Sequence, residues 1–210
     1  MAGPAVKPPV PRLLLISDGL ADPALPDKVE AGCRGGLPAF LLREPSLDHR
    51  RLQSLAIELL GLLMPRKVTF LIHARVELAL TLPHAGCHLP GNGMPTRQAR
   101  AILGPERLLG RSCHTSREMR VAFGEGADYV TLSPLFSTAS HPGAPALGLE
   151  VFAQLCRQAN GPCLALGGIT ADNAPQAIEN GAHGVALIRA ILENSDPESV
   201  TRHLCRRIIP

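Results

Sequence analysis

Two glycine-rich segments late in the chain have the composition of an anion-binding site. Gly167 and Gly168 end an apolar run, and a residue without Cβ lets backbone N–H groups approach an anion closely. A second apolar run, Gly184–Ala190, follows at the spacing of the next strand. Amides near its end and the Arg189 guanidinium can complete a phosphate site. The alternative is a tight strand–helix turn without a ligand. The predicted phosphate-binding residues are Gly167, Gly168, Ile188 and Arg189.

A histidine ends another apolar run, in the sequence Gly110–His114 (GRSCH). Imidazole titrates near neutral pH and moves protons in either direction, so His114 is a candidate acid–base group. The alternative is a structural histidine that only bonds a neighbour. Cys113 is a weaker candidate nucleophile, because adjacent strand residues point to opposite sides.

Other polar residues fall where apolar runs end. The segment Tyr129–Thr138 leads into a loop rich in Gly and Pro, which either covers a pocket or merely connects two elements. Four histidines do not have metal-ligand spacing and have no carboxylate among them, so we expect no metal site. These four are His73, His84, His88 and His141. The predicted substrate-pocket residues are Arg43, His73, Ser133, Thr138 and His141.

Eight short apolar runs would position these residues. Stretches with apolar residues at three- and four-residue spacing separate most of them, which indicates a parallel sheet with helices between its strands. Eight strands close into a parallel (β/α)8 TIM barrel, with functional groups at the strand C-terminal ends; an open doubly wound sheet is the alternative. The runs are Leu13–Asp18, Phe40–Glu44, Val68–His73, Gly86–Leu89, Leu108–His114, Tyr129–Ser133, Leu164–Ile169 and Gly184–Arg189.

Helices are expected over five of the intervening stretches, and the segment 19–36 is read as a short helix broken by Gly32, Gly35 and Gly36. Residues 1–11 form a Pro-rich leader that we expect to be disordered, and residues 12–210 form one barrel domain. Ser116 is the expected N-cap of its helix. The expected helices are Leu47–Leu63, Ser116–Gly124, Leu149–Ala159, Ala171–Asn180 and Pro197–Arg207.

Composition excludes several classes of protein. Aromatic residues make up 3% of the chain and the net charge is +3 without a basic run, which does not support nucleic-acid binding. No apolar run reaches the roughly 18–20 residues that span a bilayer. The start of the chain has no apolar signal core, so we expect a cytoplasmic location. The six cysteines form no C-x-x-C pair and are expected to be buried free thiols.

From Leu13 to Leu192 the chain resembles the thiamine-phosphate synthase superfamily. The family fold is a (β/α)8 barrel, in agreement with the pattern above. The resemblance rests on six stretches in the same order: Leu41–Glu44, Arg75–Ala79, Gly110–His114, Gly126–Val130, Phe136–Thr138 and Leu166–Thr170.

The superfamily has two branches. The synthase joins a hydroxymethylpyrimidine diphosphate to a thiazole phosphate, releases diphosphate, and uses Mg²⁺ held by two aspartates. At the positions that the resemblance assigns to these aspartates this chain has Ala74 and Gly93, and at two family lysines it has Pro45 and His141. The other branch, a thiazole tautomerase, moves a proton without a metal. Its Gly-Arg-Ser-Val-His motif matches Gly110–His114 with one change, which implies His114 as its acid–base group.

The resemblance therefore favours the tautomerase branch: a metal- and cofactor-independent isomerase of thiamine biosynthesis with a small phosphorylated heterocycle as ligand. Two alternatives stay open. One is a divergent thiamine-phosphate synthase, and the other is a non-catalytic barrel that binds thiazole or thiamine phosphate. The sequence does not decide the oligomeric state, and a homo-oligomer is compatible with it.

Overall fold

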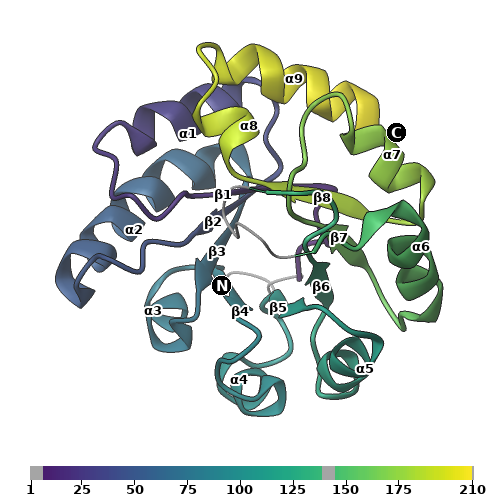
Figure 1. Ribbon diagram of the computed structural model, residues 1–210. Helices are drawn as coiled ribbons and strands as arrows, with labels where there is room; N and C mark the ends of the chain where they lie inside the picture. The colour runs from purple at the N-terminus through teal and green to yellow at the C-terminus, as the bar shows by residue number, and fades with distance from the viewer. Residues whose placement is uncertain (1–6, 139–144, 210) are drawn as a thin grey trace.

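The computed structural model describes residues 7–138 and 145–209. Eight parallel strands close into a barrel in which each strand pairs with the next and β8 returns to β1 (Figure 1). The predicted TIM barrel is confirmed, and the open sheet is wrong. The strands are β1 (Leu13–Ile16), β2 (Ala39–Leu42), β3 (Thr69–His73), β4 (Gly86–Leu89), β5 (Leu109–Cys113), β6 (Tyr129–Leu132), β7 (Cys163–Ala165) and β8 (Gly184–Leu187).

Helices form an outer ring around the barrel (Figure 1). All five expected helices are present, with ends shifted by up to three residues. The ring consists of α1 (Leu25–Arg34), α2 (His49–Leu63), the 3₁₀ helix η1 (Met64–Arg66), α3 (Val76–Thr81), α4 (Thr96–Leu103), α5 (Ser116–Gly124), α6 (Gly148–Gln158), α7 (Ala174–Glu179), α8 (Arg189–Leu192) and α9 (Pro197–Ile208).

Two local expectations about helix ends are wrong. Gly32 lies inside α1, which ends only at Gly35, where an added Cβ would lie 2.4 Å from the Glu198 carbonyl oxygen. Tertiary packing of α1 against α9, rather than local propensity, thus decides where a glycine is needed. The N-cap of α5 is Thr115, not Ser116, and it forms a capping box with Glu118.

The strands are buried on both faces, which explains their continuous apolar runs. One group of side chains fills the barrel interior and another packs between strands and helices. Among the described residues, the apolar side chains of the interior are aliphatic except for Tyr129, which is fully buried. A hydroxyl buried in an apolar barrel needs a hydrogen-bond partner, and the partner of the Tyr129 hydroxyl lies beside the site described below.

Residues 7–11 lie at the N-terminal ends of the strands, away from the predicted functional rim. Lys7 Nζ is 2.8 Å from Asp128 Oδ1, directly before β6, and the Val10 carbonyl lies 3.1 Å from His183 Nε2, directly before β8. Within the described residues, no helix combines the length and apolar character needed to cross a membrane. All six cysteines are free, and three of them are buried while the others are half-buried.

Candidate active site at the strand C-terminal ends

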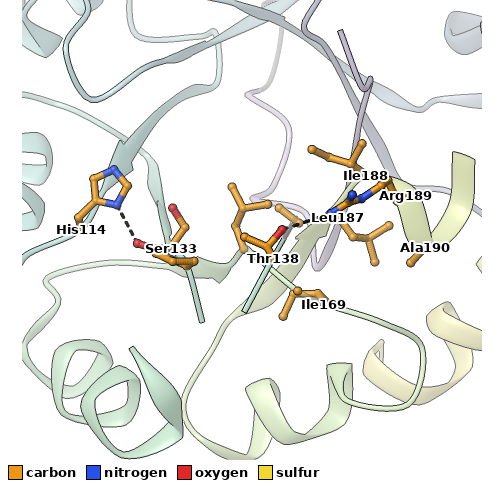
Figure 2. Close-up of a pocket in the computed structure, with 13 residues that line it drawn as sticks. His114, Ser133, Thr138, Ile169, Leu187, Ile188, Arg189 and Ala190 are labelled. Atoms are coloured by element: carbon orange, nitrogen blue, oxygen red, sulfur yellow. Dashed lines mark hydrogen bonds between the residues drawn. The ribbon is translucent and has the colours of Figure 1, made fainter. Parts of the chain in front are cut away.

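A pocket of about 260 Å³ opens at the C-terminal ends of β5–β8 (Figure 2). His114 and Ser133 lie on one side of it and Arg189 on the other, with Thr138 between them (Figure 2). The structure thus brings together most residues proposed from the sequence, from four different strand ends. The predicted residues that line the pocket are His114, Ser133, Thr138, Gly167, Gly168, Ile188 and Arg189.

Gly167 and Gly168 have φ angles of 97° and 66°, in the left-handed region that favours glycine. A Cβ at Gly168 would lie 2.6 Å from the Ser137 carbonyl oxygen and 2.7 Å from Phe136 Cβ. The glycines therefore let the loop after β6 pack directly on the loop after β7. Asn173 fixes this turn, since its Nδ2 donates to the Gly168 carbonyl at 2.9 Å. Packing alone already requires both glycines, so phosphate binding by their amides stays a prediction.

Arg189 is the cation of the pocket. It begins α8 directly after β8, and its side chain is half-buried. Its guanidinium donates to Thr138 Oγ1 at 3.4 Å, and within residues 7–138 and 145–209 it forms no ion pair with a carboxylate. An arginine held at a pocket wall without a carboxylate partner is suited to an anionic ligand.

His114 is exposed at the opposite wall. Its Nδ1 lies 2.7 Å from the Ser133 carbonyl oxygen, which only accepts hydrogen bonds, so Nδ1 carries the proton in the neutral ring. Nε2 is then the basic nitrogen. Glu118 fixes the backbone, because its Oε2 accepts from the His114 amide at 2.6 Å. The geometry suits a proton acceptor or a hydrogen-bond acceptor at Nε2.

Two predicted pocket residues lie elsewhere at the mouth. Arg43 follows β2 and His73 ends β3, and neither lines the pocket at β5–β8. Burial and then the Arg43 charge lower the pKa of His73 to about 4, so its imidazole is neutral near pH 7. His141 lies outside the described residues.

A buried hydrogen-bond network below the mouth was missed by sequence reasoning. His88 on β4 is 2% exposed; its Nδ1 lies 3.0 Å from the Tyr129 hydroxyl and its Nε2 3.0 Å from Ser112 Oγ. Burial lowers the pKa of His88 to about 3, so the ring is neutral. The His73 and His88 rings stack with centroids 6.4 Å apart, which connects the network to the mouth. The available signal was the chain's one tyrosine within an aliphatic strand.

The residues present do not fit the Mg²⁺ site that the resemblance implies. Ala74 and Gly93 offer no carboxylate, and the described residues contain no group of three His, Cys, Asp or Glu side chains arranged to hold a metal. Glu44 is 4% exposed and accepts from the amides of Gly19 and Ala21, at 3.3 and 2.8 Å. This carboxylate stabilises the loop after β1 and is not directed at a ligand.

Comparison with known proteins identifies the relatives of the chain. Residues 13–191 match the family described as thiamine monophosphate synthase. The thiamine-phosphate synthase of Roseiflexus sp. (strain RS-1) is 40% identical over 182 residues, which are 86% of this chain and 77% of that protein. The thiamine-phosphate synthase of Thermosynechococcus vestitus is 41% identical over 181 residues, 86% of this chain and 51% of that protein. This chain thus spans about half the length of the second relative.

A solved structure agrees with these sequence relatives. The thiamine phosphate pyrophosphorylase from Pyrococcus furiosus superposes with a TM-score of 0.85 at 27% identity, over 94% of this chain and 95% of that one. The two chains are therefore similar in fold and in length.

The expected closeness to the tautomerase branch, with an isomerase activity, is not supported, because the relatives above are thiamine-phosphate synthases. The glycine of the Gly110–His114 motif has a packing role. A Cβ at Gly110 would lie 2.2 Å from Tyr129 Cζ and 2.4 Å from His88 Nδ1, so the barrel interior requires a glycine there. The match over residues 13–191 and the 40% identity to a relative of similar length show that this chain belongs to the thiamine monophosphate synthase family.

Proposed function

We propose that this chain is a divergent thiamine-phosphate synthase that binds a thiazole phosphate in the pocket at β5–β8 and joins it to a pyrimidine diphosphate. The observation that carries this proposal is the 40% identity to the Roseiflexus synthase over 86% of the chain. In the reaction, the thiazole nitrogen bonds the pyrimidine methylene carbon as the carbon–oxygen bond to diphosphate breaks. The electron pair of that bond leaves with the diphosphate.

The pocket supports the thiazole end of this proposal. The phosphate would lie between the amide of Gly168 and the Arg189 guanidinium, where an arginine faces the pocket without a carboxylate partner in the described chain. The heterocycle would extend toward Ser133 and His114, whose Nε2 can accept a hydrogen bond. These groups bind and orient the nucleophile, so that its ring nitrogen points toward the centre of the mouth.

A second candidate is a non-catalytic barrel that binds thiazole phosphate or thiamine phosphate. The specific observation in its favour is the loss of four charged family positions, which in this sequence are Pro45, Ala74, Gly93 and His141. Removal of one electrostatic contribution to a transition state typically costs about 10²–10³ in rate. A chain without these groups can therefore keep its ligand and lose the reaction.

Two measurements on the purified chain separate these functions. Thiazole phosphate binding is followed by calorimetry, and thiamine phosphate formation from both substrates is followed by chromatography. Arg189→Gln should weaken thiazole phosphate binding about tenfold or more, because a charge-assisted hydrogen bond is lost. Arg120→Gln, on the exposed face of α5, is the matched control and should bind as the wild type does.

The outcomes point in different directions. Product formation with weakened binding in Arg189→Gln supports the synthase and its phosphate site. Tight binding without product supports the non-catalytic barrel. Absence of both binding and product contradicts both candidates.

A further inference from the structure

Two cysteines lie together at the N-terminal end of β7, at the end of the barrel opposite the pocket. Cys156 belongs to the last turn of α6, and Cys163 is the first residue of β7. Both border the segment that connects α7 to β8. An added Cβ at Gly181 would lie 3.3 Å from Cys156 Cβ, and the Cys163 carbonyl accepts from the His183 amide at 2.8 Å. The fold therefore brings the two cysteines side by side.

Their side chains, which we call the thiol pair, form a hydrogen bond from Cys156 to Cys163. Cys163 Sγ also lies 3.9 Å from Met119 Sδ and 3.8 Å from the Gly161 carbonyl oxygen, and neither of these atoms carries a proton. The Cys163 S–H can therefore donate to one of them while its sulfur accepts from Cys156. Because this hydrogen bond favours a negative charge on its acceptor, it lowers the pKa of Cys163 and raises the pKa of Cys156.

A surface hollow gives a small molecule access to the thiol pair. Its volume is about 390 Å³, and it lies between α6 and the end of α7, which follow one another in the outer ring (Figure 1). Cys156 is half-buried and lines the hollow, whereas Cys163 is 3% exposed and does not line it. Arg157 also lines the hollow, and its positive charge favours a thiolate at Cys156.

The remaining cysteines have surroundings that do not favour reaction. Cys87 and Cys113 are buried, and burial raises the pKa of both to about 12. Cys33 and Cys205 are half-buried, and burial raises the pKa of each of them as well. Among the described residues, no other two cysteines share a hydrogen bond. A stabilised thiolate, a second thiol and access from the surface thus coincide only at the thiol pair.

We propose that Cys156 and Cys163 are a redox-active dithiol, which a small hydroperoxide converts into an intramolecular disulfide that joins α6 to β7. The inference goes beyond the proposed function and does not depend on it, because the site lies at the end of the barrel opposite the thiazole pocket.

The reaction has two steps. Proton transfer along the hydrogen bond places the negative charge on Cys156, the sulfur beside the hollow. This thiolate attacks a peroxide oxygen, the O–O bond breaks, and the alkoxide leaves and takes up the proton that the pair had lost. The Cys163 sulfur then attacks the resulting Cys156 sulfenic acid, the S–O bond breaks, and water leaves with the Cys163 proton. Two thiols thus lose two electrons and two protons, and the hydroperoxide is reduced to an alcohol and water.

The test exposes the folded chain to tert-butyl hydroperoxide, blocks the remaining thiols with N-ethylmaleimide and digests the protein with trypsin without a reductant. Cleavage after Arg157 separates the thiol pair onto peptides 121–157 and 158–189, each of which contains no other cysteine. Mass spectrometry should find these two peptides joined. Before digestion, the oxidised chain should be a monomer that is lighter by two hydrogen atoms, and dithiothreitol should restore its mass.

Variants separate the thiol pair from unspecific oxidation. Cys156→Ser and Cys163→Ser should each abolish the cross-link. Cys205→Ser is the matched control, because Cys205 is also half-buried but its thiol donates to the Gly36 carbonyl at 3.4 Å, and this variant should form the cross-link at the wild-type rate. Circular dichroism checks that each variant is folded. The linkage itself is read in the wild type, so the result does not depend on the folding of a variant.

Three results would overturn the inference. One is a cross-link from either peptide to a third cysteine, and another is a Cys156 sulfinic acid without a cross-link. The third is a thiol pair that stays reduced at a hydroperoxide concentration that oxidises Cys205 or free glutathione.

Discussion

Substitution of Gly110 by alanine tests why the structure needs a glycine in the middle of β5. The φ angle at Gly110 is not in the left-handed region, so the effect of a Cβ there is steric rather than conformational. That atom would lie 2.2 Å from Tyr129 Cζ and 2.4 Å from His88 Nδ1. Both neighbours are buried within the barrel and cannot move into solvent. The two side chains must therefore separate, which breaks their 3.0 Å hydrogen bond.

The expected cost has two parts. Overpacking of a well-packed core typically costs about 1–3 kcal/mol. A buried donor or acceptor that loses its partner costs about 1–3 kcal/mol more. Gly110→Ala should thus lower the free energy of unfolding by about 2–6 kcal/mol. For a domain of this size that corresponds to a fall in Tm of roughly 4–24 °C.

Urea denaturation followed by circular dichroism measures this change, with a constant m value as the check on two-state unfolding. Gly61→Ala is the matched control, because Gly61 lies within α2 and an added Cβ meets nothing within 4 Å. Alanine there should raise stability by about 0.5–1 kcal/mol through helix propensity. If Gly110→Ala loses less than about 1 kcal/mol, the packing explanation of this glycine is wrong.

Two further changes in stability follow from the structure. His73 and His88 have pKa values lowered to about 4 and about 3 in the folded protein, against about 6.5 when unfolded. Their contribution to the free energy of unfolding is therefore full above pH 6.5 and is lost as the pH falls toward the folded values. Between pH 7 and pH 5, the free energy of unfolding measured by urea denaturation should fall by about 1.4 kcal/mol per pH unit on account of the buried His88. The slope should be smaller in His88→Gln, and equal slopes would contradict the assignment. Ala74, at φ 62°, carries backbone strain, so Ala74→Gly should raise the free energy of unfolding by up to about 1 kcal/mol in the same assay, and a loss of stability would refute this reading.

The polar residues that end strands were predictable as a group, because the C-terminal ends of parallel strands meet at one mouth. His114, Ser133 and Arg189 indeed line one pocket. Their individual roles were not predictable. The Gly110–His114 motif suggested a reaction, but its glycine makes room for a tyrosine and a histidine from two other strands. Such contacts join residues 19 and 22 positions apart and leave no local pattern.

The sequence by itself determined the barrel, because eight apolar runs at the right spacing admit few arrangements once both faces of each strand must be buried. It also determined the family, through ordered motifs along most of the chain. Only the tertiary structure placed Arg43 and His73 apart from the pocket of Arg189, and only it paired His88 with Tyr129. Side-chain direction around a closed barrel depends on strand register and tilt, and neither is encoded in the residues of one strand alone.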